Sequence, residues 1–181
     1  MRRAALALLG ALALSACATL QTGFDYDREA RFDGYKSFAW LARAHPATRN
    51  PLNVRRVQDA IASELEAKGL HLEADPARAD LAVDFTVGSA ERTDITSYPV
   101  EFRGGWRWGG GYFGSEVDVR QYREGTMAID LFDARAHRPV WHGWARKPLS
   151  RADLDNPGPA ISAAVAAVLA RYPPGAAAAT H

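Results

Sequence analysis

Alternation of apolar and polar residues is the feature that most constrains how this chain can fold. It is found in residues 80–87, 117–132 and 140–146. In the first of these segments, Leu81, Val83, Phe85 and Val87 all fall on one face. Successive side chains of a strand point to opposite faces, so the pattern predicts strands that are apolar on one side only. A polar turn at residues 133–138 makes the last two segments a predicted β-hairpin.

Two helices are predicted where an Asn-Pro pair precedes an apolar stripe. Asn50-Pro51 and Asn156-Pro157 supply an N-cap followed by a proline at the first helical position. Gly69 is expected to end the first helix and Pro173-Pro174 the second. The stripes are Val54, Val57, Ile61 and Leu65 in the first helix, and Ile161, Val165, Val168 and Leu169 in the second.

With a first strand over residues 35–40, the predicted order is strand, helix, strand, irregular loop, strand, strand, helix. One-sided strands and one-sided helices bury their apolar faces against each other. The expected fold is therefore α+β. It is a two-layer sandwich with a mainly antiparallel sheet of about four to five strands and two helices on one face.

The N-terminus has the order of a secretory signal. Arg2 and Arg3 precede an apolar stretch too short to span a bilayer as a mature helix, and the small residues of Leu14-Ser15-Ala16-Cys17 follow. This ending resembles a bacterial lipobox, which implies cleavage between Ala16 and Cys17 and lipid on Cys17. Cys17 is the only cysteine of the 181 residues and so has no disulfide partner within the chain.

We therefore divide the chain into a signal peptide (1–16), a lipidated tether (17–23), one domain (24–173) and a disordered tail (174–181). Removal of the signal leaves 20 basic and 21 acidic side chains, a formal net charge of −1. This balance argues against nucleic acid as a partner. Lipid on Cys17 is the expected membrane attachment. In similar lipoproteins a residue such as Ala18 after the cysteine implies export to the outer membrane.

Residues 98–114 form a predicted loop rich in glycine and aromatic residues. Amphipathic aromatics near cations suit a membrane interface, sugar rings or a partner protein. The alternative is a mobile insertion whose aromatics fold back over the open face of the sheet. The candidate contact residues are Arg103, Trp106, Arg107, Trp108, Tyr112 and Phe113.

The sequence contains no recognisable catalytic motif. Gly88-Ser89-Ala90 and Gly114-Ser115-Glu116 lack the pattern of a nucleophile elbow. The five histidines are scattered, and we expect no metal and no cofactor. An alternative is an envelope glycan hydrolase using Asp84 and Asp130, which requires their carboxyl groups to lie within roughly 5–10 Å across a concave surface.

Several segments in order resemble the bacterial lipoproteins grouped as domain of unknown function 4136. They are Phe24-Asp25-Tyr26-Asp27, residues 32–40, residues 79–85, Gly125-Thr126, residues 130–133, residues 141–145 and residues 167–174. The resemblance implies a periplasm-facing lipoprotein domain and carries over no catalytic residues. We expect a non-enzymatic envelope lipoprotein that binds a protein, lipid or glycan near the outer membrane, or that serves envelope integrity without a discrete ligand.

Overall fold

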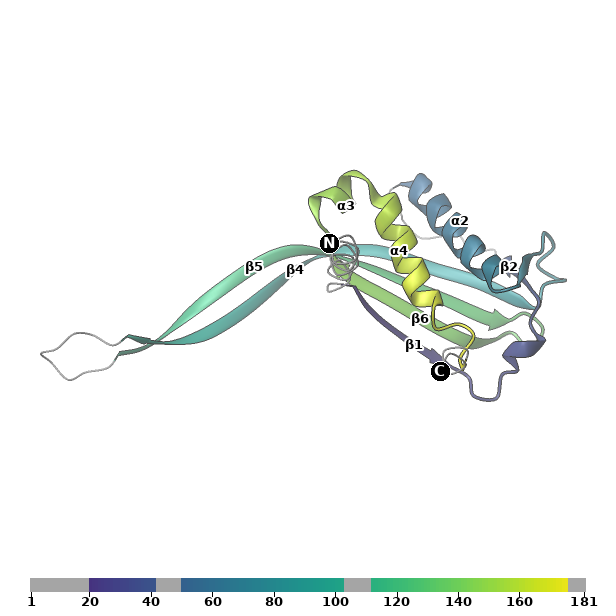
Figure 1. Ribbon diagram of the computed structural model, residues 1–181, viewed down its shortest axis with the longest axis horizontal. Helices are drawn as coiled ribbons and strands as arrows, with labels where there is room; N and C mark the ends of the chain where they lie inside the picture. Colours follow the sequence, from purple (N-terminus) through teal and green to yellow (C-terminus); the bar gives the residue numbers. More distant parts are fainter. Residues whose placement is uncertain (1–19, 42–49, 103–111, 176–181) are drawn as a thin grey trace, which may run out of the picture.

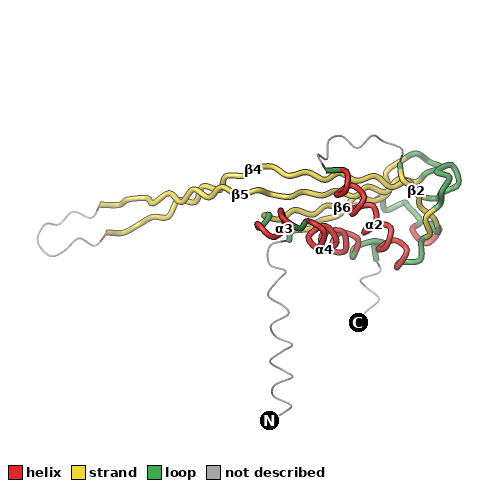
Figure 2. Tube along the Cα trace, turned by 90° about the horizontal axis from the view of Figure 1, so that it is seen from above, coloured by secondary structure: helices red, strands yellow, loops and turns green. Residues whose placement is uncertain are grey.

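The computed structural model describes residues 20–41, 50–102 and 112–175. Within these residues one six-stranded sheet carries its helices on a single face (Figures 1 and 2). The strand order is β1-β6-β5-β4-β2-β3; β2 runs parallel to β3 and β4, and the other neighbours are antiparallel. The elements are β1 (Gln21–Tyr26), η2 (Phe32–Gly34), β2 (Ser37–Trp40), α2 (Pro51–Ala67), β3 (His71–Leu72), β4 (Leu81–Phe102), β5 (Tyr112–Asp133), β6 (Arg138–Pro148), α3 (Arg151–Asp155) and α4 (Pro157–Leu169).

The sequence signals for α2 act as expected. The Asn50 side chain accepts a hydrogen bond from the backbone N–H of Leu52 (3.0 Å), with Pro51 at the start of the helix. Gly69, just after the helix, has a φ of 88°, a conformation that favours glycine. The helix buries Val57, Ile61 and Leu65 against the sheet side of the core. Caps and stripe together thus fix where α2 begins, ends and packs.

The core lies between the helices and one face of the sheet. The predicted apolar faces are buried: Leu81, Val83 and Phe85 on β4 have 0–3% exposure, and Ile129 on β5 has 0%. The two tryptophans of β6 lie on opposite faces of the sheet, as their three-residue spacing in a strand requires. Trp141 is buried under the helical layer, and Trp144, three residues on, is partly exposed.

Gly143 is the close-packing point of β6. A Cβ placed there would meet the ring of Trp141 and lie 2.7 Å from Val168 Cγ1 on α4. A side chain at this position would therefore push the helix away from the sheet or displace the buried indole. Glycine allows the two layers to meet over Trp141.

A polar cluster fixes the start of β4. Asp80 Oδ2 accepts hydrogen bonds from the backbone N–H groups of Lys36 (3.0 Å) and Ser37 (3.2 Å) and from the Ser37 hydroxyl (3.1 Å). Chiefly because of the Lys36 hydrogen bond, the pKa of Asp80 lies below its ordinary value. Nearby, the Tyr35 hydroxyl donates to Asp133 (3.0 Å), and burial together with this carboxylate raises the pKa of Tyr35 to about 12. Asp80 thus links β4 to the chain entering β2.

The structure extends the predicted architecture in three places. The sheet has six strands rather than four to five, because β1 and the short β3 add an edge on each side. β1 begins at Gln21, so it takes up residues that we had expected in the tether. Part of the predicted loop 98–114 is strand, since β4 continues to Phe102 and β5 begins at Tyr112. None of the described helices is long and apolar enough to cross a membrane.

Candidate functional site

The β4–β5 hairpin extends beyond the rest of the sheet as a two-stranded arm (Figures 1 and 2). Pairing of β5 with β6 ends at Glu124↔Pro148, whereas β4 and β5 stay paired out to Phe102↔Tyr112. We call the twelve pairs from Glu91↔Arg123 to Phe102↔Tyr112 the arm. At about 3.4 Å per residue it reaches roughly 40 Å from the sandwich.

Charged side chains pair across the two strands where the arm leaves the sheet. Arg92 Nε lies 3.3 Å from Glu124 Oε1, and Arg123 Nη2 lies 3.5 Å from Glu91 Oε1. The side chains of Arg92, Arg123 and Glu91 are 47–83% exposed and that of Glu124 is 14% exposed. Ion pairs with exposed partners contribute little to stability. The arm therefore has no described apolar core of its own at its base.

Two of the six predicted contact residues fall at the end of the arm. Tyr112 and Phe113 belong to β5, where their backbones pair with Phe102 and Glu101. Arg103, Trp106, Arg107 and Trp108 lie outside the described residues, as do Ala16 and Cys17. Of the predicted contact residues, the structure thus places only Tyr112 and Phe113, on the hairpin that projects beyond the sheet.

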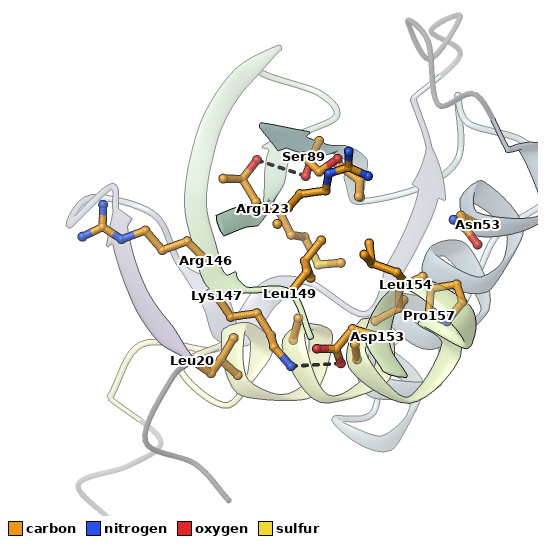
Figure 3. Close-up of a pocket in the computed structure, with 18 of the residues that line it drawn as sticks. Leu20, Asn53, Ser89, Arg123, Arg146, Lys147, Leu149, Asp153, Leu154 and Pro157 are labelled. Atoms are coloured by element: carbon orange, nitrogen blue, oxygen red, sulfur yellow. Dashed lines mark hydrogen bonds and ion pairs between the residues drawn. The ribbon is translucent and has the colours of Figure 1, made fainter. Parts of the chain in front are cut away.

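A cavity of about 650 Å³ lies at the base of the arm, between the sheet and the ends of the helices (Figure 3). Sequence reasoning missed it, because its lining comes from distant parts of the chain: Leu20 before β1, Val87 on β4, Met127 on β5, Leu149 after β6 and Ile161 on α4. Its volume is within the range typical of small-molecule sites, and much of its lining is apolar.

Gly125 shapes one wall of this cavity. A Cβ at Gly125 would lie 2.9 Å from Leu149 Cδ2, so the absence of a side chain lets Leu149 lie against β5. The backbone N–H of Leu149 also donates to the carbonyl of Arg123 (2.7 Å). Leu149 is thereby held over the point where the arm leaves the sheet.

A lysine and an aspartate meet at the polar side of the cavity (Figure 3). Lys147 Nζ lies 3.1 Å from Asp153 Oδ1, with side-chain exposures of 25% and 15%. The other oxygen of Asp153 accepts from the backbone N–H and the hydroxyl of Ser150 in the capping box that begins α3. Chiefly because of the Ser150 hydroxyl, the pKa of Asp153 is below its ordinary value. An ionised Asp153 thus holds the Lys147 ammonium at the cavity.

Asp84 and Asp130 lie on the opposite, helix-free face of the sheet. They are direct cross-strand partners, and Asp130 is also paired in register with His142 of β6. The Nδ1 atom of His142 is 2.6 Å from Asp130 Oδ1, a contact that the sequence did not predict. The strand register therefore makes Asp84 and Asp130 neighbours, as the hydrolase hypothesis requires. However, neither carboxylate lines the 650 Å³ cavity or a smaller one between α2 and α4, so no observation favours glycan hydrolysis.

Within residues 20–41, 50–102 and 112–175, no group of three or more His, Cys, Asp or Glu side chains is arranged to hold a metal ion. Asp84, Asp130 and His142 are cross-strand neighbours on three adjacent strands.

Comparison with known protein families identifies the family of this chain. The family model described as domain of unknown function (DUF4136) matches residues 23–174, most of the chain. The protein belongs to this family, as the sequence resemblance had indicated. Comparison with curated proteins gives no match.

Solved structures support the fold. A PDZ domain protein from Parabacteroides distasonis gives a TM-score of 0.56 at 15% identity over 92% of this chain, which spans only 40% of that protein. A DUF4136 family protein from Bacteroides thetaiotaomicron gives 0.54 at 15% identity, covering 86% of this chain and 96% of the other. PelC from Paraburkholderia phytofirmans, solved as a dodecamer, gives 0.50 at 16% identity, covering 83% and 94%. At these identities the likeness concerns the fold alone.

Proposed function

We propose that this protein is a non-enzymatic binding module, anchored to the outer membrane by lipid on Cys17 and facing the periplasm, that contacts an envelope component through its arm. The observation that carries the proposal is the continuation of β4 and β5 for twelve residue pairs beyond the sheet. Core residues on these strands end near Val87 and Met127, so the fold does not need the outer pairs for its apolar burial.

The chemistry of the hairpin supports a contact role. An isolated two-stranded ribbon is marginally stable in water, and its strands expose unpaired backbone groups along their outer edges. The sequence that connects the two strands, residues 103–111, contains tryptophan and arginine residues. Such residues dominate binding energy in many interfaces, because they bury large areas and donate hydrogen bonds. A partner that covers the arm would satisfy both its backbone edges and its aromatics.

The anchor is supported by the sequence order Leu14-Ser15-Ala16-Cys17 and by the position of β1. β1 begins at Gln21, four residues after Cys17, so the tether would hold the domain within about 15 Å of the lipid. A purely structural role in envelope integrity is the alternative in which the arm has no discrete ligand.

In-cell photocrosslinking from position 106 of the full-length lipidated protein tests this proposal. We expect a discrete protein, lipid or glycan adduct, identified by mass spectrometry. The same probe at Glu29, an exposed residue next to β1 at the end of the sheet away from the arm, is the matched control.

Two variants sharpen the test. Serine at Trp106, Trp108, Tyr112 and Phe113 should abolish the envelope contact while the far-UV spectrum is unchanged. Replacement of residues 92–122 by Asn-Gly, which closes the Glu91↔Arg123 pair with a two-residue turn, should do the same. An identical adduct pattern at positions 106 and 29, or an envelope phenotype indifferent to both variants, would rule out the arm as the contact surface.

A further inference from the structure

The cavity at the arm base combines an apolar floor with a lysine at its edge. Val87, Met127 and Ile161 contribute apolar surface from the sheet and from α4. The aliphatic stem of Lys147 also belongs to the lining, and its ammonium group lies at Asp153. A long side chain with an apolar stem and a charged end suits a ligand that is itself apolar at one end and charged at the other.

Lys147 retains the capacity to bind an anion. An ammonium group has three N–H donors, and in the part of the chain that the structure describes its polar partner is Asp153 alone. Ser150 donates two hydrogen bonds to Asp153 and so fixes the carboxylate. Because this carboxylate holds the Lys147 ammonium at the edge of the cavity, the lysine does not have to move to meet a ligand there. A phosphate at the edge of the cavity would accept the remaining hydrogen bonds in a charge-assisted geometry.

The position of Leu20 connects this cavity with the membrane. Leu20 is the first described residue and lines the cavity beside Lys147 (Figure 3). Cys17 precedes it by three residues, so lipid on Cys17 would lie within about 10 Å of the cavity wall. An anchored chain therefore carries this apolar cavity at the membrane surface.

We propose that the cavity binds one acyl chain of an anionic phospholipid taken from the membrane to which the protein is anchored. The chain lies on the floor formed by Val87, Met127 and Ile161, and the phosphate meets Lys147. This inference rests on the proposed anchoring through Cys17. In this proposal the lipid binds in the cavity at the base of the arm, and the arm itself contacts a separate partner.

A photoactivatable lipid tests the assignment. The full-length lipidated protein is reconstituted into nanodiscs that contain phosphatidylglycerol with a diazirine near the end of one acyl chain, irradiated, digested and analysed by mass spectrometry. We expect adducts on the peptides that carry Val87, Met127 and Ile161.

Two alanines of α4 supply matched variants. Ala160 lines the cavity, and Ala163 is exposed on the same helix. Ala160→Phe, which fills the cavity, should reduce the cavity adducts at least tenfold, whereas Ala163→Phe should leave them unchanged. We expect the wild type to give more cavity adducts with phosphatidylglycerol than with phosphatidylcholine, and Lys147→Gln should remove this preference. Circular dichroism verifies that each variant is folded.

Flotation on vesicles separates the two ways in which the inference can fail. If the protein floats but carries no adduct on the cavity peptides, it is anchored to the membrane and the proposed lipid site is wrong. Adducts that persist in Ala160→Phe equally overturn the site, because the lipid is then bound elsewhere. A protein that does not float lacks the anchoring on which both proposals rest.

Discussion

The inner half of the β4–β5 hairpin, Leu81–Gly88 with Thr126–Asp133, and its outer half, the arm, are formed by the same two strands in one unbroken register. The inner half lies under α2 and α4 and is flanked by β2 and β6, and its core-facing side chains are almost fully buried. At the base of the arm, charged side chains pair across the two strands, and of these four only Glu124 is largely buried. The comparison shows that a single ladder of backbone hydrogen bonds can continue from a region of buried side chains into one whose described side chains, in residues 91–94 and 119–123, are mostly exposed.

The largest expected effect contrasts two apolar residues of β5. Ile129 is 0% exposed and Val119 is 53% exposed. Ile129→Ala should lower the free energy of unfolding by about 2–5 kcal/mol, because it opens a cavity in the core. Val119→Ala should change it by no more than about 0.5 kcal/mol. Urea denaturation measures both, and equal losses would show that the arm has a packed core after all.

The next largest effect concerns Asp80, whose hydrogen bonds hold the start of β4. Asp80→Ala should destabilise the protein by about 1–3 kcal/mol at pH 7, since it removes the acceptor for Lys36 and Ser37. The folded-state pKa of Asp80 is lowered, so its contribution is complete above the ordinary pKa of 3.8 and is lost as the pH falls through the folded-state value.

The difference in stability between wild type and Asp80→Ala should therefore shrink progressively below about pH 4. Denaturation at a series of pH values measures it, with Asp59→Ala as the control at an exposed carboxylate of α2. A difference that is constant from pH 7 to strongly acidic conditions would mean that the carboxylate charge does not fix the start of β4.

Shortening the arm should affect stability less than either core change. The Asn-Gly replacement of residues 92–122 leaves every buried residue of the core cluster in place. We expect the free energy of unfolding to change by less than about 1 kcal/mol, because a two-stranded ribbon adds little net stability. Thermal and urea unfolding provide the measurement. A loss of several kcal/mol would make the arm part of the folding unit.

The smallest expected effect is that of the ion pair at the arm base. A double-mutant cycle with Arg92→Gln and Glu124→Gln should give a coupling free energy of about 0.2–1 kcal/mol, and it should decrease as salt is added. A coupling well above this range, or one insensitive to salt, would indicate that the base of the arm is more rigid than its exposure suggests.

Local patterns in the sequence predict the inner half of the hairpin and both main helices. The alternation from Leu81 to Val87 needs a buried face, and the Asn50 cap places the start of α2 correctly. The arm is predicted only in part: residues 117–123 of β5 belong to the predicted strand 117–132, whereas residues 91–102 of β4 were expected in the irregular loop. On β4 the apolar alternation ends while the backbone pairing continues from the inner half. The first three residues of β1 (21–23) were assigned to the tether and the other three to the domain, since a six-residue edge strand has a weak pattern.

The candidate site divides in the same way. The contact segment at residues 98–114 is visible in the sequence as a local concentration of glycine and aromatic residues. The cavity is not visible, because Leu20 and Ile161 meet only when β1 and α4 are placed on the same sheet. Local composition can locate a surface segment, whereas a cavity lined by distant residues requires the fold.

The unbroken register of β4 and β5 also bears on how this family can diverge. Insertion or loss of two residues in each strand of the arm returns every remaining side chain to its original face, whereas a change of one residue in one strand would invert them. Each such step changes the reach by about 7 Å without altering the sandwich. The length of the hairpin can therefore change while the domain below stays the same, which would let the proposed contact surface be set at different distances from the domain.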